Sequence, residues 1–235
     1  TKFSITIKST NKILQILNKA YDRAISGRPG PVWIDIPLDI QGKIIKKPKR
    51  ILKINKIKNK DISINKIKKV QKLLLKSSRP VFLIGHGARI SKSKENFLKL
   101  IKKLNIPCLF TWNTMDFLPF SHKLNYGRPG NVAIRSSNFI IQNSDLLISI
   151  GCKLDNIVTA YNPKNFAPYA KKVYVNIDQH TYKNLKLKIN IFFKNDANRF
   201  IIELGKIKIK KKYPDWIKFC DKLKEKYKLE NEKKF

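Results

Sequence analysis

The sequence predicts an α/β protein built on a doubly wound parallel sheet. Short apolar runs of strand length alternate with segments whose apolar residues recur at helical spacing. This alternation is typical of parallel strands joined by crossover helices. Several runs are apolar at every position, which indicates that helices cover both faces of the sheet.

The first complete unit begins with the apolar run from Pro80 to Ile84, followed by Gly85-His86-Gly87. We expect the two glycines to let the chain reverse with a positive φ, and to let a ligand or a helix end approach bare backbone. A helix follows with Phe97, Leu98, Ile101 and Leu104 on one face.

Residues 1–41 predict a strand, a helix from Asn11 to Ala24 and a second strand from Pro31 to Pro37. Three such elements cannot bury both faces of a sheet, so we interpret them as the end of a larger domain. Residues 42–62 are rich in lysine and have no sustained period, which predicts a linker. Asp61 or Ser63 is expected to cap the helix that leads to Pro80.

Residues 63–205 are predicted to form the main domain. Its later elements are strand Pro107 to Thr111, helix Val132 to Asn143, strand Asp145 to Ile150, strand Lys172 to Ile177, strand Ile189 to Phe193 and helix Ala197 to Gly205. Residues 206–235 are predicted to be a basic linker and an amphipathic helix, Tyr213 to Tyr227, which has only the preceding domain to pack against.

The charge balance is strongly basic, with 51 Lys and Arg against 16 Asp and Glu and a net charge of +35. Such a balance alone would favour a nucleic-acid partner. The lysines, however, are spread along nearly every segment and accompany an excess of Ile and Asn, as AT-rich codon usage produces. We therefore expect no nucleic acid as partner. No run approaches the ~20 apolar residues of a membrane span, and residues from Thr1 do not resemble a secretion signal, so a cytoplasmic protein without membrane contact is expected.

The cysteines and histidines predict no metal site. Cys108, Cys152 and Cys220 are far apart and form no C-x-x-C pair. The three histidines lack a second ligand at metal spacing. Cys108 and Cys152 are better interpreted as small buried hydrophobic residues.

Ligands of doubly wound sheets bind outside the carboxyl ends of the strands. The loops to inspect are therefore 85–89, 111–113, 151–159 and 176–178. Gly85 and Gly87 offer backbone N–H groups beside a helix start, where a phosphate could bind. The dinucleotide fingerprint nevertheless fails, because Ile90 replaces its third glycine and Thr111 and Trp112 stand where its acidic residue is expected.

Two further turns share the sequence Gly-Arg-Pro-Gly, at residues 27–30 and 127–130. They are either simple tight turns or rigid mounts that present an arginine to an anion. Asp155 and Asp178 could form a carboxylate pair only if the fold brings them together. No serine, threonine or cysteine nucleophile stands beside a base, and no catalytic residue is assigned.

Several segments in consistent order resemble thiamine-diphosphate enzymes of the acetolactate synthase type, in particular the subgroup from polysaccharide gene clusters. ISGRPGPVWIDIPLDIQG resembles the end of their N-terminal, pyrimidine-binding domain. The segments RPVFLIGHGARIS, IPCLFTWNTMDFLPFSH, YGRPGNVAIRSSNFIIQNSDLLISIGCKLD and NFAPYAKKVYVNIDQ resemble their Rossmann-like central domain.

The resemblance implies a three-domain subunit in a homodimer or homotetramer, using thiamine diphosphate and Mg²⁺ on a 2-oxo acid. The catalytic glutamate of the family belongs to the first domain, but residues 1–42 contain no glutamate, and the chain has no Gly-Asp-Gly metal motif. We therefore expect a fragment that is inactive alone. It would contribute the end of the pyrimidine domain, the central domain and the start of the link to a diphosphate-binding domain.

The resemblance also implies an FAD in a non-redox, mainly structural role in the central domain. By position, its contacts would be Arg28, Gly85, Gly87, Thr111, Trp112, Gly127, Gly151, Asp155, Asn176, Asp178 and Asp196. Three departures leave FAD, an ADP-like nucleotide and an empty site all open: Lys153 and Ile157 replace two usual arginines, and Asn176 replaces a usual acid. Other enzymes of the class, such as pyruvate oxidase or glyoxylate carboligase, and a stand-alone nucleotide-binding module remain alternatives.

Overall fold

The computed structural model describes residues 1–45 and 61–228. The chain divides into two compact units after Asn59, and each is described by itself. Most of the predicted linker, at 46–60, lies outside the described residues. No helix among those that are described is long and apolar enough to cross a membrane.

The first unit is one βαβ element. β1 (Ser4–Thr6) pairs in parallel with β2 (Trp33–Asp35), and η1 (Thr10–Lys12) and α1 (Ile13–Ile25) connect them. A short helix that the sequence did not predict, α2 (Leu38–Gln41), follows. Buried apolar residues here are few, namely Ile7, Ala20 and Ile40. The predicted strand, helix and strand are confirmed.

The second unit holds a parallel sheet of five strands in the order β4-β3-β5-β6-β7. The strands are β3 (Pro80–Ile84), β4 (Cys108–Phe110), β5 (Leu146–Ile150), β6 (Lys171–Val175) and β7 (Ile191–Phe193). Every residue of β3 and β5 is buried, as expected for strands covered on both faces. The predicted doubly wound α/β fold is confirmed.

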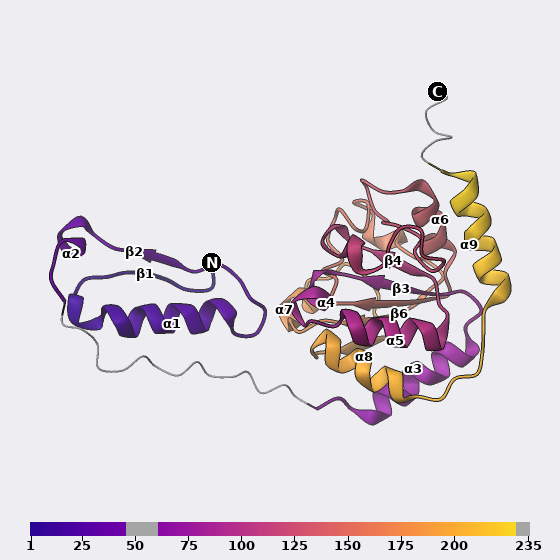
Figure 1. Ribbon diagram of the computed structural model, residues 1–235, viewed down its shortest axis with the longest axis horizontal. Helices are drawn as coiled ribbons and strands as arrows, with labels where there is room; N and C mark the ends of the chain where they lie inside the picture. The colour runs from indigo at the N-terminus through magenta and orange to yellow at the C-terminus, as the bar shows by residue number, and fades with distance from the viewer. Residues whose placement is uncertain (46–60, 229–235) are drawn as a thin grey trace, which may run out of the picture. The chain divides into compact units, whose positions relative to one another are not determined.

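Helices cover the two faces in separate groups (Figure 1). α3 (Ile64–Lys76), α5 (Lys94–Leu104) and α8 (Ala197–Lys206) lie on one face, and α6 (Arg135–Asn143) and α9 (Pro214–Lys226) lie together on the other. The short helices α4 (His86–Ile90), η2 (Trp112–Phe117), η3 (Pro163–Asn165) and α7 (Gln179–Lys183) lie in the connections. The strand order reverses direction between β3 and β5, so the loops after these two strands border the switch point where ligands bind in such sheets.

The last helix packs back onto the second unit, as its amphipathic pattern predicted. Trp216 is buried, and its indole Nε1 donates to the carbonyl oxygen of Pro80 at 2.9 Å. The Tyr213 hydroxyl donates to the carbonyl oxygen of Leu74 at 2.8 Å. These bonds anchor the start of α9 to the end of α3 and the start of β3.

The capping prediction before α3 was half right. Ser63 is the N-cap residue, but its side chain makes no capping hydrogen bond. The Asp61 carboxylate instead pairs with the Arg199 guanidinium at 2.6 Å. The contact ties the entry of the unit to α8, although such exposed pairs contribute little stability.

The turn after β3 differs from the expectation. Gly85 has φ −116°, and neither Gly85 nor Gly87 is among the glycines with positive φ. The need for glycine comes instead from neighbouring backbone, because a Cβ on Gly85 would lie 2.4 Å from the Cα of Cys152. A Cβ on Gly87 would lie 2.9 Å from the Cα of Gly151. Another group does approach the bare backbone of these glycines closely, but it is the loop after β5 and not the ligand or helix end that was expected.

Replacing Gly85 with alanine should therefore destabilise the second unit by about 2 to 3 kcal/mol, because two backbones must separate. Gly205→Ala is the matched control: Gly205 lies in α8, its Cβ would meet nothing within 4 Å, and the change should stabilise by up to about 1 kcal/mol. Urea unfolding of the 235-residue chain measures both. Equal effects of the two substitutions would contradict the packing argument.

Candidate functional site

The predicted site residues of the second unit follow the carboxyl ends of its strands. Gly85 and Gly87 follow β3, Thr111 and Trp112 follow β4, Gly151 and Asp155 follow β5, Asn176 and Asp178 follow β6, and Asp196 follows β7. Gly127 joins this edge because its carbonyl oxygen accepts from Phe110 N at 2.9 Å. Arg28 belongs to the first unit, which is described by itself.

The two loops at the switch point are bonded to each other. Gly85 N donates to Ile150 O at 2.9 Å, and Gly87 N donates to Gly151 O at 2.8 Å. Gly151 has φ +63°, and its own Cβ would lie 2.5 Å from Ala88 N. The backbone amide of Gly87, considered above as a phosphate donor, is therefore already used in holding β3 to β5.

A second cluster lies beside β4, where Arg128 stacks on Trp112. The guanidinium carbon lies 3.6 Å from the centre of a Trp112 ring. Its Nε donates to Val132 O at 2.7 Å, and Nη1 lies 2.9 Å from the sulfur of Met115. Burial lowers the Arg128 pKa, yet a guanidinium stays charged at any ordinary pH. Trp112 is 52% exposed, so the stack presents a flat, cationic and aromatic surface to solvent.

Arg128 and Met115 were missed as site residues. The sequence signal for Arg128 was its turn, which was interpreted either as a tight turn or as an anion-binding mount. The structure shows a rigid turn in which Gly127 has φ +81° and Gly130 has φ +120°. Met115 carried no signal, because a lone methionine in a loop matches no motif.

The Gly-Arg-Pro-Gly turn is also locked to the loop after β5. A Cβ on Gly130 would lie 2.3 Å from the carbonyl oxygen of Ile157. Asn131 N donates to the same oxygen at 2.9 Å. Ile157 is one of the two positions at which the family resemblance would place an arginine, so the residue whose backbone holds this turn has an uncharged side chain.

The polar residues of the other loops mostly bind their own segments. Asp155 accepts from Val158 N at 3.2 Å. Asp178 caps α7 by accepting from His180 N at 2.9 Å, and Asp196 caps α8 by accepting from Arg199 N at 3.1 Å. Asn176 donates to Cys152 O at 3.2 Å and accepts from Asp178 N at 2.9 Å. Asp155 and Asp178, considered above as a carboxylate pair, therefore each bind a backbone N–H group of their own loop.

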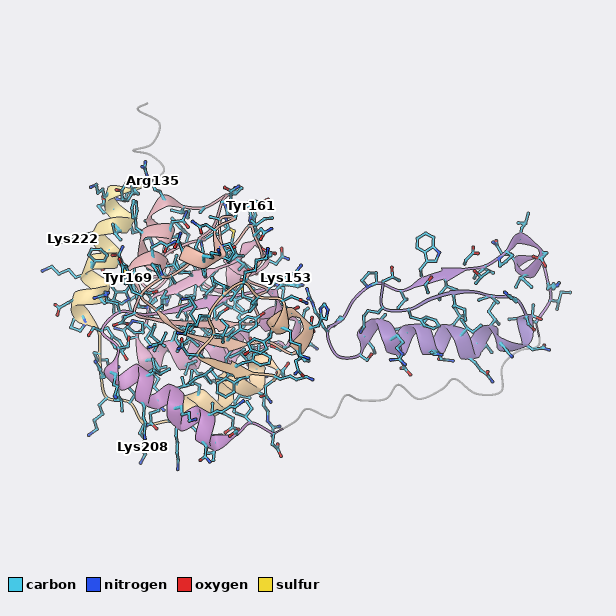
Figure 2. The ribbon with its side chains drawn as sticks, turned by 180° about the vertical axis from the view of Figure 1, so that it is seen from behind. Arg135, Lys153, Tyr161, Tyr169, Lys208 and Lys222 are labelled. Carbon is cyan, nitrogen blue, oxygen red and sulfur yellow. The ribbon has the colours of Figure 1, made fainter. Side chains whose placement is uncertain are left out.

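The connection from β5 to β6 contains strained backbone. Leu154, Ala160, Tyr161 and Ala167 all have positive φ, between 49° and 58°, where residues other than glycine are uncommon. Tyr161, labelled in Figure 2, is 66% exposed. Such strain is often found beside ligand sites, and this connection begins at the switch point.

No group of three or more His, Cys, Asp or Glu within residues 1–45 and 61–228 is arranged to hold a metal ion. The cysteines are buried, as predicted for Cys108 and Cys152. Burial raises the pKa of the Cys152 thiol to about 12 and also raises that of Cys108. These thiols are therefore protonated at neutral pH and are not nucleophiles there.

Comparison with known proteins supports the resemblance seen in the sequence. Residues 67–204 match the family model described as "Thiamine pyrophosphate enzyme, central domain", which is more than half of the chain. The chain belongs to the thiamine pyrophosphate enzyme family. The matched residues lie entirely within the second unit and include all five strands of its sheet.

Curated relatives are acetolactate synthases. A probable acetolactate synthase large subunit of Methanococcus aeolicus is 35% identical over 211 residues, covering 87% of this chain and 35% of the relative. A probable acetolactate synthase large subunit of Methanocaldococcus jannaschii is 34% identical, covering 87% and 35%. The acetolactate synthase isozyme 1 large subunit of Escherichia coli is 30% identical, covering 79% and 33%. The chain thus spans about a third of the length of these relatives.

The buried thiols predict a fall in stability at alkaline pH. Above the ordinary thiol pKa of about 8.5 the unfolded chain loses the Cys152 proton, whereas the folded chain keeps it to about pH 12. The unfolded state then binds fewer protons, so the free energy of unfolding falls with rising pH, by at most ~1.4 kcal/mol per pH unit for each thiol.

Urea unfolding between pH 8 and 11 tests this effect, with Cys152→Ala as the comparison. The slope of the unfolding free energy against pH should be shallower in the variant, because one buried thiol has been removed. An unchanged slope would show that Cys152 ionises equally in both states.

Proposed function

We propose that the whole protein is a thiamine-diphosphate-dependent carboligase or decarboxylase acting on 2-oxo acids, of the acetolactate synthase type. The names of the relatives support the reaction class. This chain would contribute scaffold, subunit contacts in a homodimer or homotetramer, and a nucleotide site, but no catalytic group. Thiamine diphosphate and Mg²⁺ would bind in parts of the protein beyond these residues, and a cytoplasmic location is expected.

The proposed nucleotide site lies at the carboxyl edge of the sheet. The observation that carries this proposal is the Arg128–Trp112 stack, which lies in the connection after β4, the strand beside β3. A planar ring can lie on such a surface, because aromatic and guanidinium faces both favour stacking. The switch-point amides are less suited to a phosphate, since Gly87 N already has an acceptor.

FAD or an ADP-like nucleotide fits this arrangement through its ring system. Trp112 and Arg128 would hold the ring, with the bare backbone of Gly127 and Gly151 bordering it. An FAD here would be a structural group rather than a redox centre. Lys153, labelled in Figure 2, is a cation in the loop after β5, and it would be available to a phosphate as a point charge.

Flavin binding tests the site directly. FAD is titrated into the purified chain and binding is followed by quenching of flavin fluorescence. Arg128→Ala should weaken binding about 2- to 30-fold, because a cation–π stacking contact of ~0.5 to 2 kcal/mol is lost. ADP is titrated in competition to separate flavin from adenine recognition.

Arg79→Ala is the matched control for this loss. Arg79 lies at the amino end of β3, and its Nε also donates to a backbone carbonyl oxygen, that of Asn143, at 2.7 Å. The Arg79→Ala variant should bind FAD as tightly as the unaltered chain does. Failure of the unaltered chain to bind FAD or ADP would refute the nucleotide site, and equal losses in both variants would refute the role of the stack.

The absence of a catalytic role is tested by activity. The 235-residue chain, supplied with thiamine diphosphate, Mg²⁺ and pyruvate, should form no acetolactate above the uncatalysed background. Production of acetolactate by this chain alone would overturn the division of labour proposed here.

A further inference from the structure

A buried segment without helix or strand joins η2 to the Gly-Arg-Pro-Gly turn. Within residues 118–126, Leu118, Leu124, Asn125 and Tyr126 are all at most 2% exposed. Backbone hydrogen bonds fasten the end of this segment to β4: Cys108 N donates to Leu124 O at 2.9 Å, and Tyr126 N donates to Cys108 O at 3.0 Å. Side chains of the last helix, α9, bind the segment as well.

Two residues of α9 bind this segment. The Tyr126 hydroxyl donates to the Asp221 carboxylate at 2.7 Å. The Lys224 ammonium donates to Asn125 O at 2.8 Å and to Phe120 O at 3.0 Å. It also lies 4.8 Å from the centre of the Phe120 ring and 5.7 Å from that of Tyr126. Burial lowers the Lys224 pKa while Asp221 acts to raise it, which places the two charges near each other.

The same segment holds the turn that carries Arg128. The Asn125 side chain accepts from Gly127 N at 2.9 Å and donates to Leu118 O at 3.0 Å. Gly127 is further held by Phe110 N on β4. Arg128 follows directly and stacks on Trp112. A continuous series of contacts therefore leads from α9 through Asn125 and Tyr126 to the stack.

We propose that Asp221 and Lys224 are positioning residues: through Tyr126 and Asn125 they set the orientation of the Gly127–Arg128 turn, and with it the Arg128–Trp112 stack. The importance of this for ligand binding rests on the function proposed above. Through this contact, a displacement of α9 changes the surface offered to a planar ring. The helix thus couples one face of the domain to the carboxyl edge of its sheet.

The other end of α9 provides an internal comparison. The Tyr213 hydroxyl donates to Leu74 O, so this tyrosine binds α3 and not residues 118–126. Removing that hydroxyl also loosens α9, but it leaves the route to Arg128 intact. If α9 has a purely structural role, loss of a hydrogen bond at either end should affect the Arg128–Trp112 stack equally. If α9 positions the stack, loss of the bond to Tyr126 should affect it more than loss of the bond to Leu74.

Fluorine NMR of the 235-residue chain labelled with 5-fluorotryptophan tests this difference. The chain has three tryptophans, at 33, 112 and 216, and Trp112→Phe assigns the resonance of interest. Tyr126→Phe, Asp221→Ala and Lys224→Met should each move the Trp112 resonance by more than its linewidth. Asp221→Asn, which keeps an oxygen acceptor for Tyr126, should restore the resonance toward its original position. Tyr213→Phe should move the Trp216 resonance and leave that of Trp112 unchanged.

The Trp112 resonance alone decides the positioning role. If it stays in place in Tyr126→Phe and Asp221→Ala, or moves equally in Tyr213→Phe, the proposal is overturned. FAD titration of the same variants is the separate arm. If the Trp112 resonance moves but the chain binds no FAD, the positioning role is supported and the nucleotide site is refuted. If the chain binds FAD but the resonance does not move, the nucleotide site is supported and the positioning role is refuted.

Discussion

The close contact between the loops after β3 and β5 is the constraint on which the second unit depends. These strands are neighbours in the sheet although β4 separates them in sequence, so their loops meet at the switch point. Gly85, Gly87 and Gly151 approach so closely that no side chain fits between them. Two main-chain hydrogen bonds then fasten the loops. Any ligand at this edge is bordered by a backbone surface that the protein itself has already shaped.

The scarcity of acidic residues shapes the rest of the hydrogen bonding. With 16 acidic against 51 basic side chains, most lysines cannot find a carboxylate, and several cap carbonyl oxygens instead. Lys103 donates to Gly205 O at 2.6 Å, and Lys211 donates to Leu75 O at 2.8 Å, both at helix ends. Lys172, only 7% exposed, donates to Ala167 O at 2.7 Å. A cation near the end of a helix is electrostatically favourable, so an excess of lysine is compatible with a stable fold.

Four carboxylates of the second unit, among the residues that the structure describes, accept hydrogen bonds from backbone N–H groups. Asp145 accepts from Ser78 N at 2.7 Å and from Arg79 N at 2.9 Å, which fixes the entry of β3 beside that of β5. Asp155, Asp178 and Asp196 cap their own loops in the same way. Under the function proposed above, recognition at the carboxyl edge would therefore rely on stacking surfaces, backbone and cations, because these acidic groups are already engaged.

The sequence by itself determined the strands and most helices of the second unit, because strand-length apolar runs such as Pro80–Ile84 and helical spacing such as that of Phe97 and Ile101 are local patterns. The family followed from the resemblance of segments such as RPVFLIGHGARIS. The sequence also predicted that the candidate residues of the second unit follow the carboxyl ends of the strands, and the structure has them there. Only the tertiary structure decided how these ends meet. Glycine is needed at position 85 because the backbone of Cys152 lies against it. The Arg128 side chain is held by its contacts with Trp112 and Met115. Contacts between residues so distant in sequence depend on strand order and side-chain packing, which no local pattern records.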